Sequence, residues 1–266
     1  MADSTYISKN LTADQRKFMK LLDRHEILYF NMTEIESRLQ ESFSNLNEVL
    51  ENLVDKEILV RVERGKYALA DFHDLNVLAT FMARDGMIAY WSALHHHGLT
   101  DRFPNTIFVK TIHRKRKTTL FGPAVWFITV HPRKMTGHQY EGYGDKRYPL
   151  TDIECTLMDC FDQPKYAGEW ADLLRAFFRA EIDVGKLIHY ATTYNNLAVI
   201  KRMGYLATLT GKAELNPFID FARHHLGKEF ALFDPTGRDE GAYTSNWKLR
   251  MNMTEEDIID TVQSPY

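Results

Sequence analysis

Histidine side chains are the groups in this 266-residue sequence that are best suited to binding a metal ion. Histidines fill positions 95–97, and a second pair stands at His224 and His225. Neighbouring residues of a helix point about 100° apart, so at most two of three consecutive rings can face one ion. Neither an HExxH pattern nor paired cysteines accompany them. We therefore favour a structural or capping role for these histidines and expect no bound metal and no cofactor.

The two cysteines, Cys155 and Cys160, stand five residues apart within a predicted helix, where their side chains point in different directions. This spacing indicates free, buried thiols, which are typical of proteins of the reducing cytoplasm. Asp159, between them, is a candidate functional carboxylate, although an aspartate of this kind more often is solvated or belongs to a hydrogen-bond network.

The sequence lacks the local signatures of the common enzyme classes. It contains no Walker loop, no GxSxG elbow, no CxxC pair and no clustered carboxylates of the metal-binding type. Catalytic groups that are distant in sequence leave no local trace, so this absence does not exclude an enzyme. We nevertheless predict a protein that has no catalytic residues and is not an enzyme.

The densest positive charge in the chain is the segment formed by Arg114, Lys115, Arg116 and Lys117. Residues 101–150 contain ten lysines and arginines but three aspartates and glutamates. Runs rich in β-branched and aromatic residues stand on either side of the segment and predict strands. Two interpretations remain open: a solvated hairpin loop, or a surface that binds phosphates or an acidic partner.

The elements that precede this region predict a winged helix-turn-helix. Apolar residues at helical spacing indicate one helix from Thr12, a second over 33–40 and a third that follows Ser42 and ends near Lys56. Thr33 and Glu36 have the spacing of a capping box. Residues 58–69 alternate as a hairpin whose turn, 64–66, is basic. Three helices and a hairpin can bury one small core and offer the third helix to a DNA major groove.

The residues expected to face DNA come from the third helix and the wing. Hydroxyl and amide groups near the helix start can pair with base edges or phosphates, and cations of the wing can meet the backbone. These candidates are Ser44, Asn45, Asn47, Arg61, Arg64 and Lys66. Glu48 and Glu51 argue against DNA, and residues 1–70 contain ten basic and twelve acidic residues. A winged helix that binds a protein partner therefore remains the alternative.

The chain length suits this small module followed by a larger second domain. We predict an α+β protein with a winged helix-turn-helix at 1–70, a connecting helix at 71–86 and a mixed α/β domain at 87–266. That domain is expected to begin with a small sheet and continue with helices over 153–161, 169–180, 183–193, 196–210 and 216–225. An irregular acidic tail, folded over the basic sheet or engaging a partner, is expected to follow.

The composition is that of a globular protein with a true core, since 44% of the residues are hydrophobic and 12% are aromatic. The net charge of −3 neither indicates nor excludes a nucleic-acid partner. No apolar run approaches the roughly 20 residues that span a bilayer, and the first residues lack the pattern of a signal peptide. We expect a cytoplasmic protein without a membrane partner.

The order of segments resembles the AbiEi family, the antitoxins of type IV abortive-infection toxin–antitoxin systems. The matching segments cover roughly residues 12–210: RGKYAL (64–69), YWSALHHHGL (90–99), YPLTDIECTLMD (148–159), YAG (166–168) and KRMG (201–204). Glu169 stands where the family often has a second glycine, and Met203 stands where it has leucine. The tail after about Thr210 matches nothing in the family.

The resemblance implies an autorepressor and antitoxin without a cofactor. Its winged helix would bind double-stranded promoter DNA through the six candidate residues above. Its C-terminal domain would counter a toxin that is similar to nucleotidyltransferases, with or without direct contact. The alternative is a solitary winged-helix regulator whose second domain binds a small molecule or a protein; a nucleotidyltransferase gene beside this one would favour the antitoxin.

Overall fold

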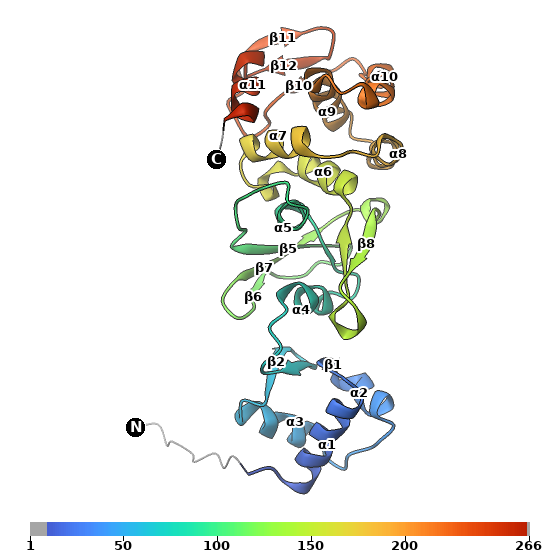
Figure 1. The fold of residues 1–266 in the computed structure, drawn as a ribbon, viewed down its shortest axis with the longest axis vertical. Helices are drawn as coiled ribbons and strands as arrows, with labels where there is room; N and C mark the ends of the chain where they lie inside the picture. Colours follow the sequence, from blue (N-terminus) through green and yellow to red (C-terminus); the bar gives the residue numbers. More distant parts are fainter. Residues whose placement is uncertain (1–9, 265–266) are drawn as a thin grey trace, which may run out of the picture. The chain divides into compact units, whose positions relative to one another are not determined.

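The computed structural model describes residues 10–264 and has an α+β fold that divides into two compact units (Figure 1). Unit 1 contains the residues up to Arg84 together with Gly142–Arg147. Unit 2 contains Asp85–Glu141 and the residues from Tyr148 onward.

Unit 1 is a winged helix in which three helices pack on a three-stranded antiparallel sheet of order β1-β3-β2. Its elements are α1 (Ala13–Arg24), β1 (Tyr29–Asn31), α2 (Met32–Leu39), α3 (Leu46–Asp55), β2 (Leu59–Glu63) and β3 (Lys66–Leu69), and a further helix of unit 1, α4 (Leu75–Met82), follows the sheet. Thr12 and Gln15 form a capping box at the start of α1, as the predicted helix start at Thr12 requires. Phe18, Ile35 and Leu50 are completely buried between the helices.

The predicted starts of α2 and α3 are wrong. Asn31, not Thr33, caps α2, because its side chain accepts the backbone N–H of Thr33. Glu36 therefore does not close a box and instead accepts the N–H of Phe43 at 2.7 Å. Phe43 precedes α3 and places its ring edge-on to Phe18, 5.4 Å between centroids. The three-residue strand β1 was not predicted, since it is too short to show an alternating pattern.

Unit 2 is built on a six-stranded mixed sheet of order β6-β7-β5-β4-β9-β8. Its strands are β4 (Met87–Ile88), β5 (Thr106–Thr111), β6 (Thr118–Thr119), β7 (Ala124–Thr129), β8 (His138–Glu141) and β9 (Tyr148–Thr151). Strands β5 and β7 are parallel neighbours, and β8 and β9 form a hairpin. The predicted strands on either side of the basic segment are confirmed, but they do not form a hairpin, because parallel strands require the chain to cross back.

Helices α5 (Tyr90–His96) and α6 (Ile153–Asp162) cover one face of this sheet (Figure 1). The chain continues in α7 (Trp170–Arg179), α8 (Val184–Tyr194), α9 (Leu197–Thr210) and α10 (Asn216–His224), which confirm the predicted helices. Asp152 caps α6 and Asp183 caps α8. Both cysteines are buried free thiols on α6, as their spacing predicted.

The predicted irregular tail is wrong. After α10 the chain forms β10 (Ala231–Leu232), β11 (Ala242–Thr244), β12 (Leu249–Met251) and α11 (Glu255–Gln263), with the sheet order β10-β12-β11. Phe233, Leu249 and Ile258 are completely buried in the core of unit 2. These apolar residues are widely spaced in the sequence, so no period revealed them. The segment completes the core instead of lying over the basic sheet.

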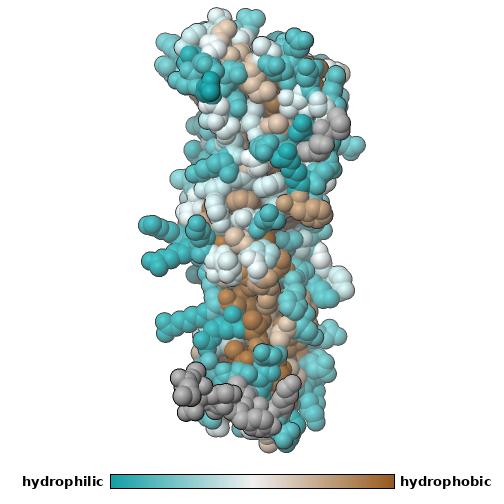
Figure 2. All heavy atoms as spheres, turned by 90° about the vertical axis from the view of Figure 1, so that its left-hand side faces the viewer, coloured by the Kyte–Doolittle hydropathy of each residue, from teal (hydrophilic) through white to brown (hydrophobic). Residues whose placement is uncertain are grey.

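Between residues 10 and 264, no helix combines the length and the apolar character that crossing a membrane requires. Figure 2 shows hydrophilic residues over most of one face, interrupted by a smaller area of apolar ones.

A substitution at Gly204 of α9 can test how tightly the C-terminal segment packs. A Cβ atom at Gly204 would lie 2.6 Å from the Cβ of Ala222 and 2.6 Å from a ring carbon of Trp247. Gly204→Ala is therefore expected to lower the free energy of unfolding by about 1–3 kcal/mol, measured by urea denaturation. In the control Gly185→Ala the new methyl would meet Asp183 at 3.2 Å, and higher helix propensity should leave stability unchanged or raised. Equal behaviour of the two variants would contradict this packing.

Candidate functional site

The polar residues predicted to read DNA lie at the start of α3. Ser44, Asn45 and Asn47 are all exposed. Asn45 is the N-cap of α3: its Oδ1 accepts the backbone N–H of Glu48, and its Nδ2 donates to the Glu48 carboxylate at 2.6 Å. Its polar atoms thus already have partners within the helix, whereas Ser44 and Asn47 present theirs to solvent.

The outer face of α3 is acidic. The helix has the sequence LNEVLENLVD, which contains no lysine or arginine. Glu48 and Asp55 are exposed and Glu51 is half-buried. These carboxylates recur at helical spacing beside Asn47, and carboxylates repel phosphates.

One wing cation is bound by α3. Arg61 of β2 donates to a carboxylate oxygen of Glu51 and, at 3.4 Å, to the hydroxyl of Tyr67. The Tyr67 hydroxyl donates in turn to Glu51 at 3.2 Å. The hydrogen bond with Tyr67 and the charge of Glu51 raise the pKa of Arg61, and the guanidinium joins the wing to α3.

The other two wing cations differ from each other. Lys66 donates to the backbone carbonyls of Phe81 and Met82, at 2.8 and 2.9 Å, and pairs with Glu63 at 2.8 Å. Arg64 is exposed at the turn, where Gly65 adopts a φ of +76°. Arg64 is thus the wing cation placed to meet a phosphate, while Lys66 ties the wing to the end of α4.

The basic segment, residues 114–117, crosses back from β5 and leads into β6 on the edge of the sheet. Lys115 lies over the ring of Phe127 and Lys117 over that of Trp126, at 5.2 Å from each centroid. These contacts direct the two ammonium groups along β7. Arg114 and Arg116 alternate with the lysines and are exposed.

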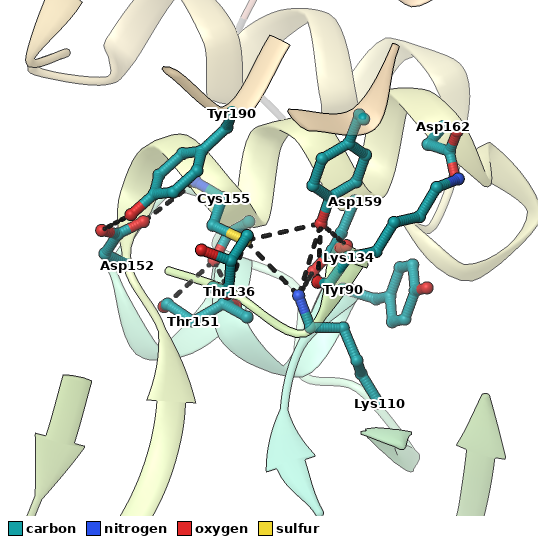
Figure 3. Close-up of polar contacts among 12 residues, drawn as sticks. Tyr90, Lys110, Lys134, Thr136, Thr151, Asp152, Cys155, Asp159, Asp162 and Tyr190 are labelled. Atoms are coloured by element: carbon teal, nitrogen blue, oxygen red, sulfur yellow. Dashed lines mark hydrogen bonds and ion pairs between the residues drawn. The ribbon is translucent and has the colours of Figure 1, made fainter. Parts of the chain in front are cut away.

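A cluster of buried polar side chains lies between β5 and the helices (Figure 3); the sequence patterns single out Asp159 and Cys155 of this cluster but neither Lys110 nor Tyr194. Lys110 of β5 is completely buried, and its Nζ lies 2.7 Å from Oδ2 of Asp159 on α6. The Tyr194 hydroxyl from α8 donates to the other carboxylate oxygen of Asp159. The Cys155 thiol lies 3.4 Å from Nζ of Lys110 and 3.5 Å from the Tyr194 hydroxyl. We call these four residues the Lys110 cluster.

Burial controls the ionisation of this cluster. It raises the pKa of the Asp159 carboxyl, an effect that the Lys110 ammonium opposes, and it raises the pKa of the Cys155 thiol to about 12. Burial, the largest single influence, works against the charge of Lys110, but the charges and hydrogen bonds of Asp159 and Cys155 together outweigh it and raise the pKa of the amine. A thiol kept protonated is a poor nucleophile. The arrangement therefore suits a structural ion pair better than a catalytic site.

Two tyrosines extend the polar contacts around the cluster. Tyr190 donates to the Asp152 carboxylate at 2.8 Å, at the start of α6 (Figure 3). Tyr90 begins α5 with a φ of +55° and accepts a hydrogen bond from Gln163 at the end of α6. Burial raises the pKa of Tyr90, and the charge of Asp159 adds to this shift. A buried tyrosine in the left-handed region is strained, so the surrounding packing must hold it there.

The three consecutive histidines, 95–97, each contact a different partner. His97 lies 2.7 Å from the backbone carbonyl of Thr151, His96 contacts the Tyr148 hydroxyl, and His95 packs on the ring of Phe103. Burial lowers the pKa of His97 and favours its neutral form. Among residues 10–264 no group of three or more histidine, cysteine or acidic side chains is arranged to hold a metal ion.

One signal in the sequence pointed to the cluster. Lys110 is a single cation within the apolar run of β5, a position where a charge needs a partner. The sequence did not show which carboxylate that partner is, because Asp159 lies 49 residues and Tyr194 84 residues further along.

The buried pair gives a test by substitution. Lys110→Met leaves the Asp159 carboxyl without its cation, so we expect a loss of about 3–5 kcal/mol in the free energy of unfolding. The double variant Lys110→Met with Asp159→Leu removes both charges and should recover much of that loss in urea denaturation. Additive losses in the double variant would show that the two groups do not depend on each other.

Comparison with known proteins identifies the fold. No protein-family model and no curated protein matches the chain. The crystal structure of the RV2827C protein from Mycobacterium tuberculosis is similar to it, with a TM-score of 0.64 and 16% identity over 97% of each chain. The likeness covers both units and shows a shared fold.

Proposed function

We propose that this protein is a DNA-binding transcription regulator whose unit 1 binds the promoter of its own gene. The observation that carries the proposal is the winged-helix topology of unit 1: three helices, a three-stranded sheet of order β1-β3-β2 and a wing with Arg64 exposed at its turn. In helix-turn-helix proteins the second helix of the motif enters the major groove, and flanking elements meet the backbone.

We further propose that unit 2 is the antitoxin part of a type IV pair that counters a nucleotidyltransferase-like toxin. The support is the resemblance to the AbiEi family, whose matching segments include the buried β9 and α6. The proposal leaves open whether toxin and antitoxin touch. It assigns the protein to the cytoplasm, where the free thiols Cys155 and Cys160 suit the reducing conditions.

A second candidate function is favoured by the charge of α3. Its outer face carries Glu48, Glu51 and Asp55 and no cation, which fits a basic protein partner better than a phosphate backbone. A regulator of this kind, with or without a small molecule bound to unit 2, would not need a neighbouring toxin gene.

DNA binding is tested with the purified full chain and the DNA upstream of its gene. We expect selective binding in a mobility-shift assay against scrambled competitor. Arg64→Ala should reduce the slope of log affinity against log salt by about 0.9, because one phosphate contact is lost. Binding that is absent or unselective would contradict the proposal and favour the protein-binding alternative. An unchanged salt slope for Arg64→Ala would show that the wing does not contact the DNA.

The basic segment has a test of its own. Replacing Arg114, Lys115, Arg116 and Lys117 by glutamine keeps the side-chain stems but removes four charges. We expect this variant to lose DNA affinity in the mobility shift, or to lose protection of cells that express the neighbouring nucleotidyltransferase gene. A folded variant that keeps both activities would show that these charges only face solvent.

A further inference from the structure

The cations of unit 1 are concentrated on α1 and not on α3. Helix α1 contains Arg16, Lys17, Lys20 and Arg24, all of them exposed, whereas α3 contains no cation. In a helix-turn-helix protein the usual expectation is the reverse, because the helix in the groove lies closest to the phosphates.

Five of the ten cations between residues 10 and 84 either pair with a carboxylate or, in the case of Lys56, donate to two other acceptors. Lys17 pairs with Glu41, and the others bind carboxylates, backbone carbonyls or an amide oxygen. These internally bound cations are Lys17, Arg38, Lys56, Arg61 and Lys66.

The three other cations of α1 have no carboxylate partner among residues 10–264. Arg16 donates one N–H to the backbone carbonyl of Leu11 at 2.7 Å, which leaves the rest of its guanidinium exposed. Lys20 and Arg24 project into solvent. Arg64 on the wing and Arg84 at the end of unit 1 are the remaining exposed cations of this part of the chain.

Their spacing places Arg16, Lys20 and Arg24 on one stripe of α1. Residues four apart follow each other along a helix face at a rise of about 6 Å per step. Asp23 stands at the edge of this stripe, and Asp14 lies towards the other side of the helix. The stripe therefore keeps a positive balance, and three cations in a row match a line of phosphates better than a single anion.

We propose that the outer face of α1, through Arg16, Lys20 and Arg24, binds the phosphate backbone of duplex DNA. This inference rests on the proposed DNA binding and changes its geometry. The backbone lies against α1, and the acidic face of α3 stays away from the phosphates that would repel Glu48 and Asp55.

The test uses the full chain with the substitutions Arg16→Gln, Lys20→Gln and Arg24→Gln together. The probes are a duplex of the DNA upstream of the gene and a scrambled duplex. Three lost phosphate contacts should lower the salt slope by about 2.7 and the affinity at 0.1 M salt by on the order of 100-fold. Both probes should be affected alike, because phosphate contacts carry no sequence information.

A matched control removes the same charge from unit 2. Lys165, Lys228 and Arg238 are exposed, and their replacement by glutamine should leave the salt slope near that of the wild type. Thermal unfolding of both triple variants establishes that they are folded, as is expected for exposed positions.

The possible outcomes distinguish a failure of the proposed α1 surface from a failure of the proposed DNA binding. A wild type that binds neither duplex overturns both. A wild type that binds, with a folded α1 variant that keeps its slope and affinity, overturns the α1 surface and leaves DNA binding in place. Equal losses in the control variant would show a general effect of net charge and would also overturn the α1 surface.

Discussion

The buried ion pair between Lys110 and Asp159 is the interaction on which unit 2 most depends. Two charges without water cost several kcal/mol unless each faces the other closely and its remaining hydrogen-bonding groups are satisfied. The pair joins the C-terminal end of β5 to α6, and Tyr194 adds α8 to the same contact. Sheet and helices must therefore keep a fixed register, because a small displacement would leave a buried charge alone.

The helices of unit 1 could be predicted because each has one apolar stripe that meets the same small core. The helix boundaries were harder to predict. Asn31 and Thr33 both suit an N-cap, and only the pairing of β1 with β3 places Asn31 at the turn into α2. Phe43 has the spacing of a helical residue, but it packs on the core residue Phe18 from the loop that precedes α3. Tertiary packing decided both positions against the local signal.

The polar interior of unit 2 and the fold of its C-terminal segment could not be predicted from the sequence, because their contacts join residues that are far apart along the chain. The lysine in β5 could have indicated a buried partner, but nothing in the sequence connects it with Asp159 or Tyr194, which lie 49 and 84 residues further along. Ile258 stands among acidic residues and Phe233 ends a short apolar run, and both become core residues only once the C-terminal segment packs on the rest of unit 2. Because β5 and β7 are parallel, the basic segment is not a hairpin loop between them but a connection that leads into the edge strand β6.

The winged-helix fold fixes which surfaces exist, and charge decides what each can bind. In unit 1 the hydrogen bonds that stabilise the wing, from Arg61 to Glu51 and from Lys66 to the end of α4, also use two of its cations. The same carboxylate that holds Arg61 makes α3 acidic. A polyanion that approaches this unit is thus repelled from α3 and attracted to the stripe on α1 and to Arg64. The internal stabilisation of the wing and the exposed cations on α1 and at Arg64 are two consequences of one distribution of charge.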